Sequence, residues 1–168
     1  MIALYPGAFK PPHRGHFEVV KGLLNGNHGG QIYDIENYTD MGMSALAGKN
    51  SKAQSINKVI VFVGAGDRNG ITKEESINVW KIYSKHLPGL EIKDGGKNPM
   101  ITAKDYAKSN AKDKFYAITG IRNEEDLVDL KRVTTFKNRD NVEGLVIPSG
   151  KESSVRATDF RKALLSGN

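Results

Sequence analysis

The sequence predicts an α/β protein with a parallel sheet of about five strands and helices on both faces. Short apolar runs that end in glycine or proline alternate with segments whose apolar residues recur at helical spacing. The run Lys58–Gly64 is mostly β-branched, which is typical of strands buried on both faces in parallel sheets. A chain of 168 residues is long enough for a proper core, so we expect a single domain over residues 1–168.

The first strand is expected at 2–7, followed by a helix on which Phe17, Val20 and Leu23 form an apolar stripe. The segment 25–57 then lacks sustained periodicity and is rich in turn-forming residues. Long connections of this kind in compact domains are typically functional lids or disordered insertions. We therefore expect a mobile insertion at about 25–57, either a passive surface loop or a lid over a bound ligand.

The rest of the chain continues the alternation of strands and helices. Strands are expected at 58–64, 90–93, 114–120 and 142–147, and helices at 74–86, 102–112 and 124–136. Thr72 and Glu75 form a capping box before the first of these helices, and Thr102 and Thr158 are candidate N-caps. We expect Trp80 to pack in the core. Ligands of such sheets bind at the carboxyl ends of the strands.

The composition limits the classes of function. The chain has no cysteine, which excludes disulfides and thiolate chemistry. Its formal charge of +6 favours polyanionic partners, but no run of five like charges occurs, so phosphorylated small molecules fit better than nucleic acid. The apolar N-terminal run stops at Pro6 without a charged leader, so we expect no signal peptide, no membrane span and a cytoplasmic location. Self-association into a homo-oligomer stays open.

Two histidines, His13 and His16, lie where the first expected helix begins. Free backbone N–H groups and the helix dipole make such a place an anion site before any side chain is counted. The imidazoles and Lys10 add donors and positive charge, and Gly7 and Gly15 have no Cβ, which lets a ligand approach the backbone. The segment is predicted to be a phosphate cradle with proton-bearing donors.

The loop after strand 58–64 contains Gly64, Gly66 and Gly70, which suggest a dinucleotide-binding fingerprint. Asn69 stands where the third glycine of G-x-G-x-x-G belongs, so this interpretation is rejected. Arg68 follows a strand end and precedes a capped helix, where an α/β sheet places substrate contacts. Arg68 is therefore either a contact to the phosphate of a substrate that accepts a transferred group, called the acceptor below, or a solvated loop arginine.

The histidine segment follows the spacing Gly-x-Phe-x-Pro-x-His-x-Gly-His, with the fixed positions at Gly7, Phe9, Pro11, His13, Gly15 and His16. This pattern resembles the signature of the HxGH nucleotidyltransferase superfamily, which includes nicotinamide-mononucleotide, phosphopantetheine and cytidylyl transferases. The segment Tyr5–Phe9 is similar to the phosphopantetheine branch, whereas the two prolines before the first histidine look more like the nicotinamide-mononucleotide branch. The resemblance implies a Rossmann-like nucleotidyltransferase fold. It also implies that the nucleotide is bound by Gly7, Ala8, Phe9 and Gly15. It implies further that the catalytic residues are His13, His16 and Lys10.

The segment 155–165 resembles a second element of the superfamily, the ISSTxxR sequence at the start of its last helix. Thr158 and Arg161 fall on its threonine and arginine, and both would lie on one face near a helix N-terminus. The resemblance implies that both bind the β- and γ-phosphates, with Arg161 among the catalytic residues. Arg156 and Ala157 replace the element's two serines, so Arg156 is the candidate substitute contact to the nucleotide.

A third similarity follows the expected strand 114–120. The sequence Gly120-Ile121-Arg122 resembles the Gly-Leu-Arg of phosphopantetheine transferases, in which the arginine meets nucleotide phosphates. Gly120 and Arg122 are therefore candidates for nucleotide binding. The alternative for Arg122 is a plain surface arginine.

Together these patterns predict a nucleotidyltransferase that moves a nucleoside monophosphate to a phosphorylated small-molecule acceptor and releases pyrophosphate. AMP from ATP is favoured over a CTP reaction. Nicotinamide-mononucleotide-type adenylyl transfer is the leading hypothesis, with phosphopantetheine adenylyl transfer and cytidylyl transfer as alternatives. Two alternatives of another class are a non-catalytic nucleotide sensor and a basic nucleic-acid-binding protein. The resemblance implies Mg²⁺, and because the sequence has no carboxylate cluster, phosphates and waters would hold the ion rather than protein ligands.

Overall fold

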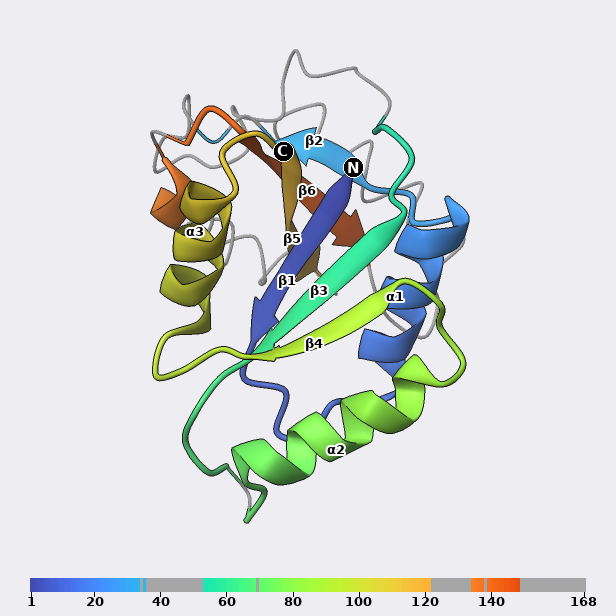
Figure 1. Ribbon diagram of the computed structural model, residues 1–168. Helices are drawn as coiled ribbons and strands as arrows, with labels where there is room; N and C mark the ends of the chain where they lie inside the picture. Colours follow the sequence, from blue (N-terminus) through green and yellow to red (C-terminus); the bar gives the residue numbers. More distant parts are fainter. Residues whose placement is uncertain (34, 36–52, 69, 122–133, 138, 149–168) are drawn as a thin grey trace.

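The structure is a computed structural model that describes residues 1–168 except 34, 36–52, 69, 122–133, 138 and 149–168 (Figure 1). Its strands are β1 (Ile2–Gly7), β2 (Gln31–Tyr33), β3 (Lys58–Val63), β4 (Leu90–Asp94), β5 (Phe115–Ile121) and β6 (Val142–Pro148). Its helices are α1 (Arg14–Asn25), α2 (Lys73–Ser84) and α3 (Pro99–Ser109). None of the helices that the structure describes is both long enough and apolar enough to cross a membrane.

The strands form one sheet in the order β2-β6-β5-β1-β3-β4. The strands β6, β5, β1, β3 and β4 run parallel, whereas β2 is antiparallel to β6. The chain builds outward from β1 in one direction through β3 and β4, and in the other through β5 and β6. The order therefore reverses between β1 and β5, which is the switch point where doubly wound sheets open a crevice at their carboxyl ends. The predicted α/β class with a mainly parallel sheet is confirmed.

The described sheet has six strands rather than the expected number of about five. The additional strand, β2, lies at one edge and pairs Gln31 with Val146 and Ile32 with Leu145. Three residues are too few to show a strand period, so the local sequence gives no signal for β2. Its pairing depends instead on contact with a strand more than a hundred positions later in the chain. The strand falls within the range 25–57, whose residues 34 and 36–52 lie outside the described part.

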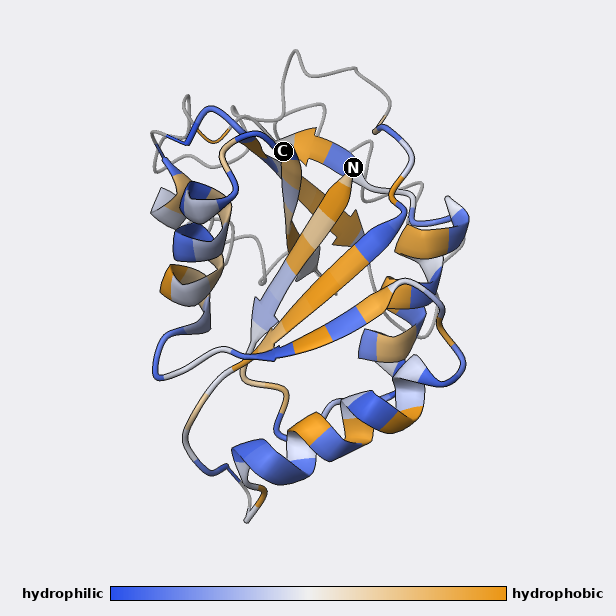
Figure 2. Cartoon of the chain, viewed as in Figure 1, coloured by the Kyte–Doolittle hydropathy of each residue, from blue (hydrophilic) through white to orange (hydrophobic). Residues whose placement is uncertain are grey.

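Both faces of the sheet are covered by helices, as predicted. On one face Leu4 and Phe62 pack with Ala103 of α3 in one core cluster. On the other face Tyr5 packs with Trp80 of α2 and with the inward side of α1 in a second cluster. Figure 1 shows α3 on one side of the sheet and α1 and α2 on the other, and Figure 2 shows hydrophobic residues along most of β3 and in the first half of β1. Successive side chains of β1 point to opposite faces of the sheet, so this single strand contributes residues to both core clusters.

Helix boundaries follow local capping signals. The capping box of Thr72 and Glu75 at α2 is confirmed, with the Thr72 side chain accepting a bond from the Glu75 N–H at 3.1 Å. The expected cap at Thr102 is wrong, because α3 begins three residues earlier with Asn98 as its N-cap. The Asn98 side chain accepts bonds from two backbone N–H groups, and Pro99 follows at the first helical position, where proline is favoured. Of the expected helix 124–136, only a 3₁₀ turn at 134–136 lies in the described part.

Candidate functional site

The histidine segment is the loop between β1 and α1, at the carboxyl end of β1 beside the switch point. The backbone N–H of Gly64, directly after β3, donates to the carbonyl of Gly7 at 2.8 Å, which holds the ends of β1 and β3 together. Figure 1 shows this loop running along α2 before the chain enters α1. The segment therefore lies where a doubly wound sheet is expected to bind its ligand.

The two histidines cap the first turn of α1. His13 is the N-cap residue with extended backbone, and its Nδ1 accepts a hydrogen bond from the N–H of Gly15 at 3.0 Å. His16 reaches back, and its Nδ1 accepts from the N–H of His13, also at 3.0 Å. The two imidazoles stack with ring centroids 3.9 Å apart and planes inclined by 28°. This reciprocal pair is an imidazole version of the capping box.

The capping bonds determine which nitrogen of each ring can act on a ligand. A nitrogen that accepts a hydrogen bond carries no proton, so the neutral imidazoles of His13 and His16 hold their proton on Nε2. Both rings are therefore donors through Nε2–H, and neither offers a free Nδ1. His13 is exposed and His16 is half-buried at the positive end of α1. In the neutral rings, Nε2–H is therefore the group through which either histidine can donate a hydrogen bond.

Phe9 packs its buried ring against His16. Its backbone lies in the left-handed region, with φ of 50°, and its ring is buried at 6% exposure. A non-glycine residue in this region stores on the order of 1–3 kcal/mol, which persists only where the surroundings enforce it. The ring lies edge-on to His16, with centroids 4.9 Å apart and planes inclined by 88°. The strained loop thus aims an aromatic ring at the second histidine.

The two glycines of the motif make room for side chains of this loop. A Cβ on Gly7 would lie 2.8 Å from Cζ of Phe9, and a Cβ on Gly15 would lie 2.7 Å from Cε1 of His13. Both distances are too short for carbon atoms in contact. The two glycines therefore permit these rings to pack against the backbone, and the approach of a ligand at Gly7 and Gly15 stays a prediction.

Lys10 is 9% exposed and lies at the same edge. Its Nζ donates to the carbonyl of Ala8 at 2.7 Å and to that of Gly64 at 2.6 Å, which links the loops after β1 and β3. Burial lowers the pKa of the Lys10 ammonium, and the neighbouring Asp67 carboxylate partly opposes that shift. Asp67 is absent from the sequence-based site, although its position after a strand end in Gly66-Asp67-Arg68 is a signal of the same kind as that used for Arg68.

Arg68 and Gly120 lie on either side of the loop that carries the histidines. Arg68 is exposed, and its backbone exchanges two hydrogen bonds with Ile71, which closes a tight loop before α2. Besides burial, the positive charges of Arg68 and Lys73 also lower the pKa of Lys10. Arg68 follows the carboxyl end of β3 and Lys73 begins α2, so both belong to the same edge of the sheet as Lys10. Gly120 pairs with Ile147 near the carboxyl end of β5, on the other side of the switch point. The predicted site residues that the structure describes therefore gather at one edge.

The remaining candidates, Arg122, Arg156, Thr158 and Arg161, lie outside the described residues. Their proximity to the histidine loop stays a prediction. Within the described part, no group of three or more His, Asp or Glu side chains is placed to hold a metal ion.

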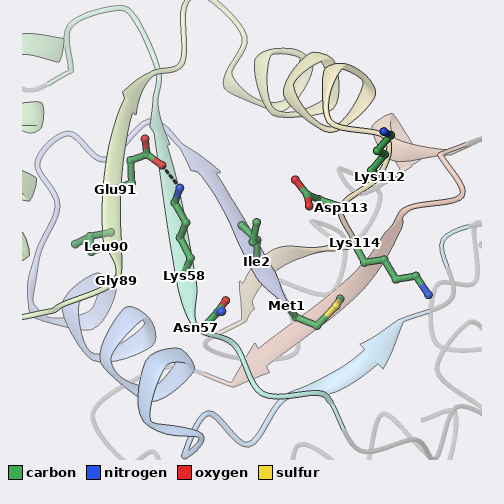
Figure 3. A pocket seen from close by; sticks show the side chains of 10 residues that line it. All are labelled: Met1, Ile2, Asn57, Lys58, Gly89, Leu90, Glu91, Lys112, Asp113 and Lys114. Atoms are coloured by element: carbon green, nitrogen blue, oxygen red, sulfur yellow. Dashed lines mark ion pairs between the residues drawn. The ribbon is translucent and has the colours of Figure 1, made fainter.

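A cavity of about 660 Å³ lies at the opposite, amino end of the sheet (Figure 3). Lys58 and Glu91 form an ion pair on its wall at 2.8 Å. The hydrogen bond between them raises the pKa of Lys58 and lowers that of Glu91. Figure 3 shows Lys112 and Lys114 pointing away from this pair, whereas the carboxylate of Asp113 points toward its side of the cavity.

A scan against protein-family models and a search of curated proteins gave no match to the chain. The Nε2–H groups of the two histidines, a helix N-terminus and the ammonium of Lys10 lie close together in this part of the chain, and groups of these kinds can bind anionic oxygens.

Proposed function

We propose that the protein is a nucleotidyltransferase of the HxGH type, which moves AMP from ATP to a phosphorylated small-molecule acceptor and releases pyrophosphate. Nicotinamide-mononucleotide-type adenylyl transfer is the preferred reaction. The observation that carries the proposal is the pairing of His13 and His16, whose Nδ1 atoms are both occupied by backbone N–H groups. The strand order around β1 supports the corresponding Rossmann-like nucleotidyltransferase fold.

In the proposed reaction an oxygen of the acceptor's phosphate attacks the α-phosphorus of ATP. The bond from that phosphorus to the bridging oxygen of the β-phosphate breaks, and pyrophosphate leaves with the electron pair. Negative charge shifts among the phosphate oxygens during this step, so catalysis requires positioning and charge stabilisation rather than a protein nucleophile. His13 and His16 donate through Nε2–H to the oxygens around the α-phosphorus, where fixed donors act most strongly on the transition state.

The other candidate residues have supporting roles in this proposal. Lys10 contributes positive charge beside the histidines, and its two carbonyl contacts keep the ammonium at the edge of the sheet. Arg68 binds the acceptor's phosphate on the β3 side. The nucleotide is bound by residues assigned through the resemblance, namely Gly7, Ala8, Phe9, Gly15, Gly120, Arg122, Arg156, Thr158 and Arg161.

Mg²⁺ is expected to accompany the triphosphate. The described side chains at this edge are mainly nitrogen donors and ammonium or guanidinium groups, which suit phosphate oxygens and are not ligands that Mg²⁺ prefers. The ion would therefore be held by phosphate oxygens and waters, and it supplies charge neutralisation on the phosphate chain when bound. The residues of the chain grip and orient the phosphates around it.

A screen of pyrophosphate release tests the proposal. The protein is incubated with ATP or CTP and Mg²⁺, each with nicotinamide mononucleotide, phosphopantetheine or a phosphorylated alcohol as acceptor. The proposal predicts release with ATP and nicotinamide mononucleotide that exceeds release with every other pair. Binding of ATP without release for any acceptor would indicate a nucleotide sensor. Salt-dependent binding of DNA without nucleotide chemistry would indicate a nucleic-acid-binding protein.

A further inference from the structure

Three aromatic rings form a cluster beneath the histidine pair, and we refer to Tyr5, Phe9 and Trp80 as the aromatic cluster. Phe9 is at its centre, with ring centroids 5.1 Å from those of both Tyr5 and Trp80. The planes are inclined by 76° and 85°, and the contact of Phe9 with His16 is also perpendicular, at 88°. Edge-to-face contacts depend on orientation, so each ring restricts the tilt of the next.

The outer member of the cluster is fixed by a different element. Trp80 is fully buried on α2, which follows β3 rather than β1. The first turn of α2 is held by the Thr72 capping box and by the ion pair of Lys73 with Asp94 at 2.7 Å. The position of Trp80 is thus set by the β3 and β4 side of the sheet. Trp80 contacts Phe9, which contacts His16 in the first turn of α1, and the Trp80 and His16 rings also lie directly beside each other, with centroids 6.4 Å apart and planes inclined by 44°.

The indole N–H of Trp80 has no hydrogen-bond partner among the described residues, although the residue is fully buried. Ser76, one turn earlier on the same helix and equally buried, also has an unpartnered hydroxyl. Leaving a buried donor unpaired is unfavourable, so an apolar side chain would be the simpler way to fill the position. The contacts that the structure gives for the indole ring include Phe9 and His16.

We propose that Trp80 is a positioning residue that orients the imidazole of His16 through Phe9. The hydrogen bond from the N–H of His13 fixes one end of the His16 ring, and the perpendicular contact with Phe9 restricts its tilt. Both constraints together aim Nε2–H in one direction. This inference rests on the proposed function for its catalytic meaning, because a misaimed donor lowers the rate while leaving ground-state binding largely intact.

The kinetic test compares three variants. Trp80→Phe keeps a ring and removes the unpaired N–H, so kcat should stay within about two-fold of the parent protein. Trp80→Leu removes the ring, and kcat should fall by roughly ten- to a hundred-fold, the size of loss that a small misplacement causes, with KM for ATP unchanged. Ser76→Ala is the matched control on the same buried face, and kcat should not change.

The structural test does not require turnover. Nuclear magnetic resonance of the His16 ring nitrogens, whose shifts report hydrogen bonding and respond little to the ring current of a neighbouring indole, should show shifts that move in Trp80→Leu and change much less in Trp80→Phe, while Ser76→Ala leaves them unchanged. A folded Trp80→Leu protein with unaltered His16 shifts and unaltered kcat would overturn the proposal. If that variant does not fold, Trp80→Met, which fills the space without a ring, provides the same comparison.

These two readouts separate failure of the positioning role from failure of the proposed function. Moved His16 shifts in a protein that transfers no nucleotide would retain the positioning role and refute the enzyme. Unmoved His16 shifts with normal turnover in Trp80→Leu would refute the positioning role and retain the enzyme.

Discussion

The ring centroids of His13 and His16 lie 3.9 Å apart, and each imidazole uses Nδ1 to accept a hydrogen bond from the backbone at the start of α1. Capping uses Nδ1 of each ring, whereas the proposed ligand contacts use Nε2. The capping bonds hold each ring at the start of α1 without any ligand. Preorganised donors of this kind require no rearrangement during a reaction.

Replacement of His13 should separate its capping role from its role as a donor. His13→Asn supplies an oxygen that can accept from the N–H of Gly15, so the stability of α1 should be preserved. His13→Ala lacks this acceptor and should lose about 0.5–2 kcal/mol of unfolding free energy. Both variants lack Nε2–H, so both should lose on the order of a hundred-fold in kcat. Denaturant unfolding and steady-state kinetics measure the two effects, and normal turnover in His13→Asn would refute the role of the donor.

Substitution of Gly15 should disturb the site, whereas the same substitution elsewhere in α1 should not. In Gly15→Ala the new Cβ would lie 2.7 Å from the His13 ring, so the ring must move and its capping bond is lost. Gly22→Ala is the control, since its Cβ meets nothing closer than 3.4 Å. Alanine in a helix is favoured over glycine by about 0.5–1 kcal/mol, so Gly22→Ala should be neutral or stabilising. Equal melting temperatures and equal activities in the two variants would contradict the packing described for His13.

The charge of Lys10 should appear in the alkaline pH dependence of activity. Burial lowers the pKa of Lys10 below its usual value of 10.5, so the ammonium loses its proton earlier than an exposed lysine as the pH rises. Activity should therefore decline below that pH in the parent protein. In Lys10→Arg, which keeps its charge, the decline should move to higher pH. An unchanged alkaline limb in a folded Lys10→Arg protein would remove Lys10 from the site.

Folding stability should rise with pH between the pKa of Lys10 in the folded protein and its usual value, whereas activity falls. The unfolded chain, with Lys10 at its usual pKa, binds more protons than the folded protein between the two pKa values. This group's contribution to folding stability therefore rises with pH in that window. A comparison of pH-dependent unfolding between the parent protein and Lys10→Met isolates the contribution. A loss of activity that coincides with a loss of stability would point to unfolding rather than to titration of Lys10.

Arg161 should act on the outer phosphates of the nucleotide. Arg161→Ala removes a guanidinium that the resemblance places on the β- and γ-phosphates, so affinity for ATP should fall by at least ten-fold. Affinity for AMP, which lacks these phosphates, should change little. Calorimetric titration of both nucleotides measures the difference. An equal loss for AMP and ATP would exclude a role at the β- and γ-phosphates.

Local sequence signals predicted most of the described fold. The run that became β3 and the capping box at Thr72 each act through neighbouring residues, so they can be recognised without tertiary information. The start of α3 was predicted at Thr102, although Asn98 and Pro99 are a stronger N-terminal signal. The strand β2 was missed because its three residues are held in place by β6 rather than by their own propensity.

The residue types of the candidate site were predictable, but their orientation was not. The motif places His13 and His16 at a helix start, and this is where the structure has them. The use of both Nδ1 atoms for capping depends on atomic geometry that no spacing rule contains. The position of the Phe9 ring over Gly7 depends on a left-handed backbone that aromatic residues rarely adopt. The sequence therefore placed both histidines at the helix start, and the structure shows that their Nδ1 atoms cap it.

Transfer of the α-phosphate of ATP is the most direct measurement of the proposed chemistry. ATP that carries radiolabel in its α-phosphate is incubated with nicotinamide mononucleotide, and the label is followed in the parent protein and in His16→Ala. We expect label in the dinucleotide product with matching release of pyrophosphate, and a loss of at least about a hundred-fold in kcat for His16→Ala with little change in ATP affinity. Exposed His86 provides a control, because His86→Ala should leave transfer unchanged. Equal transfer by folded His16→Ala and the parent protein, with any acceptor that accepts the label, would contradict catalysis by the histidine pair.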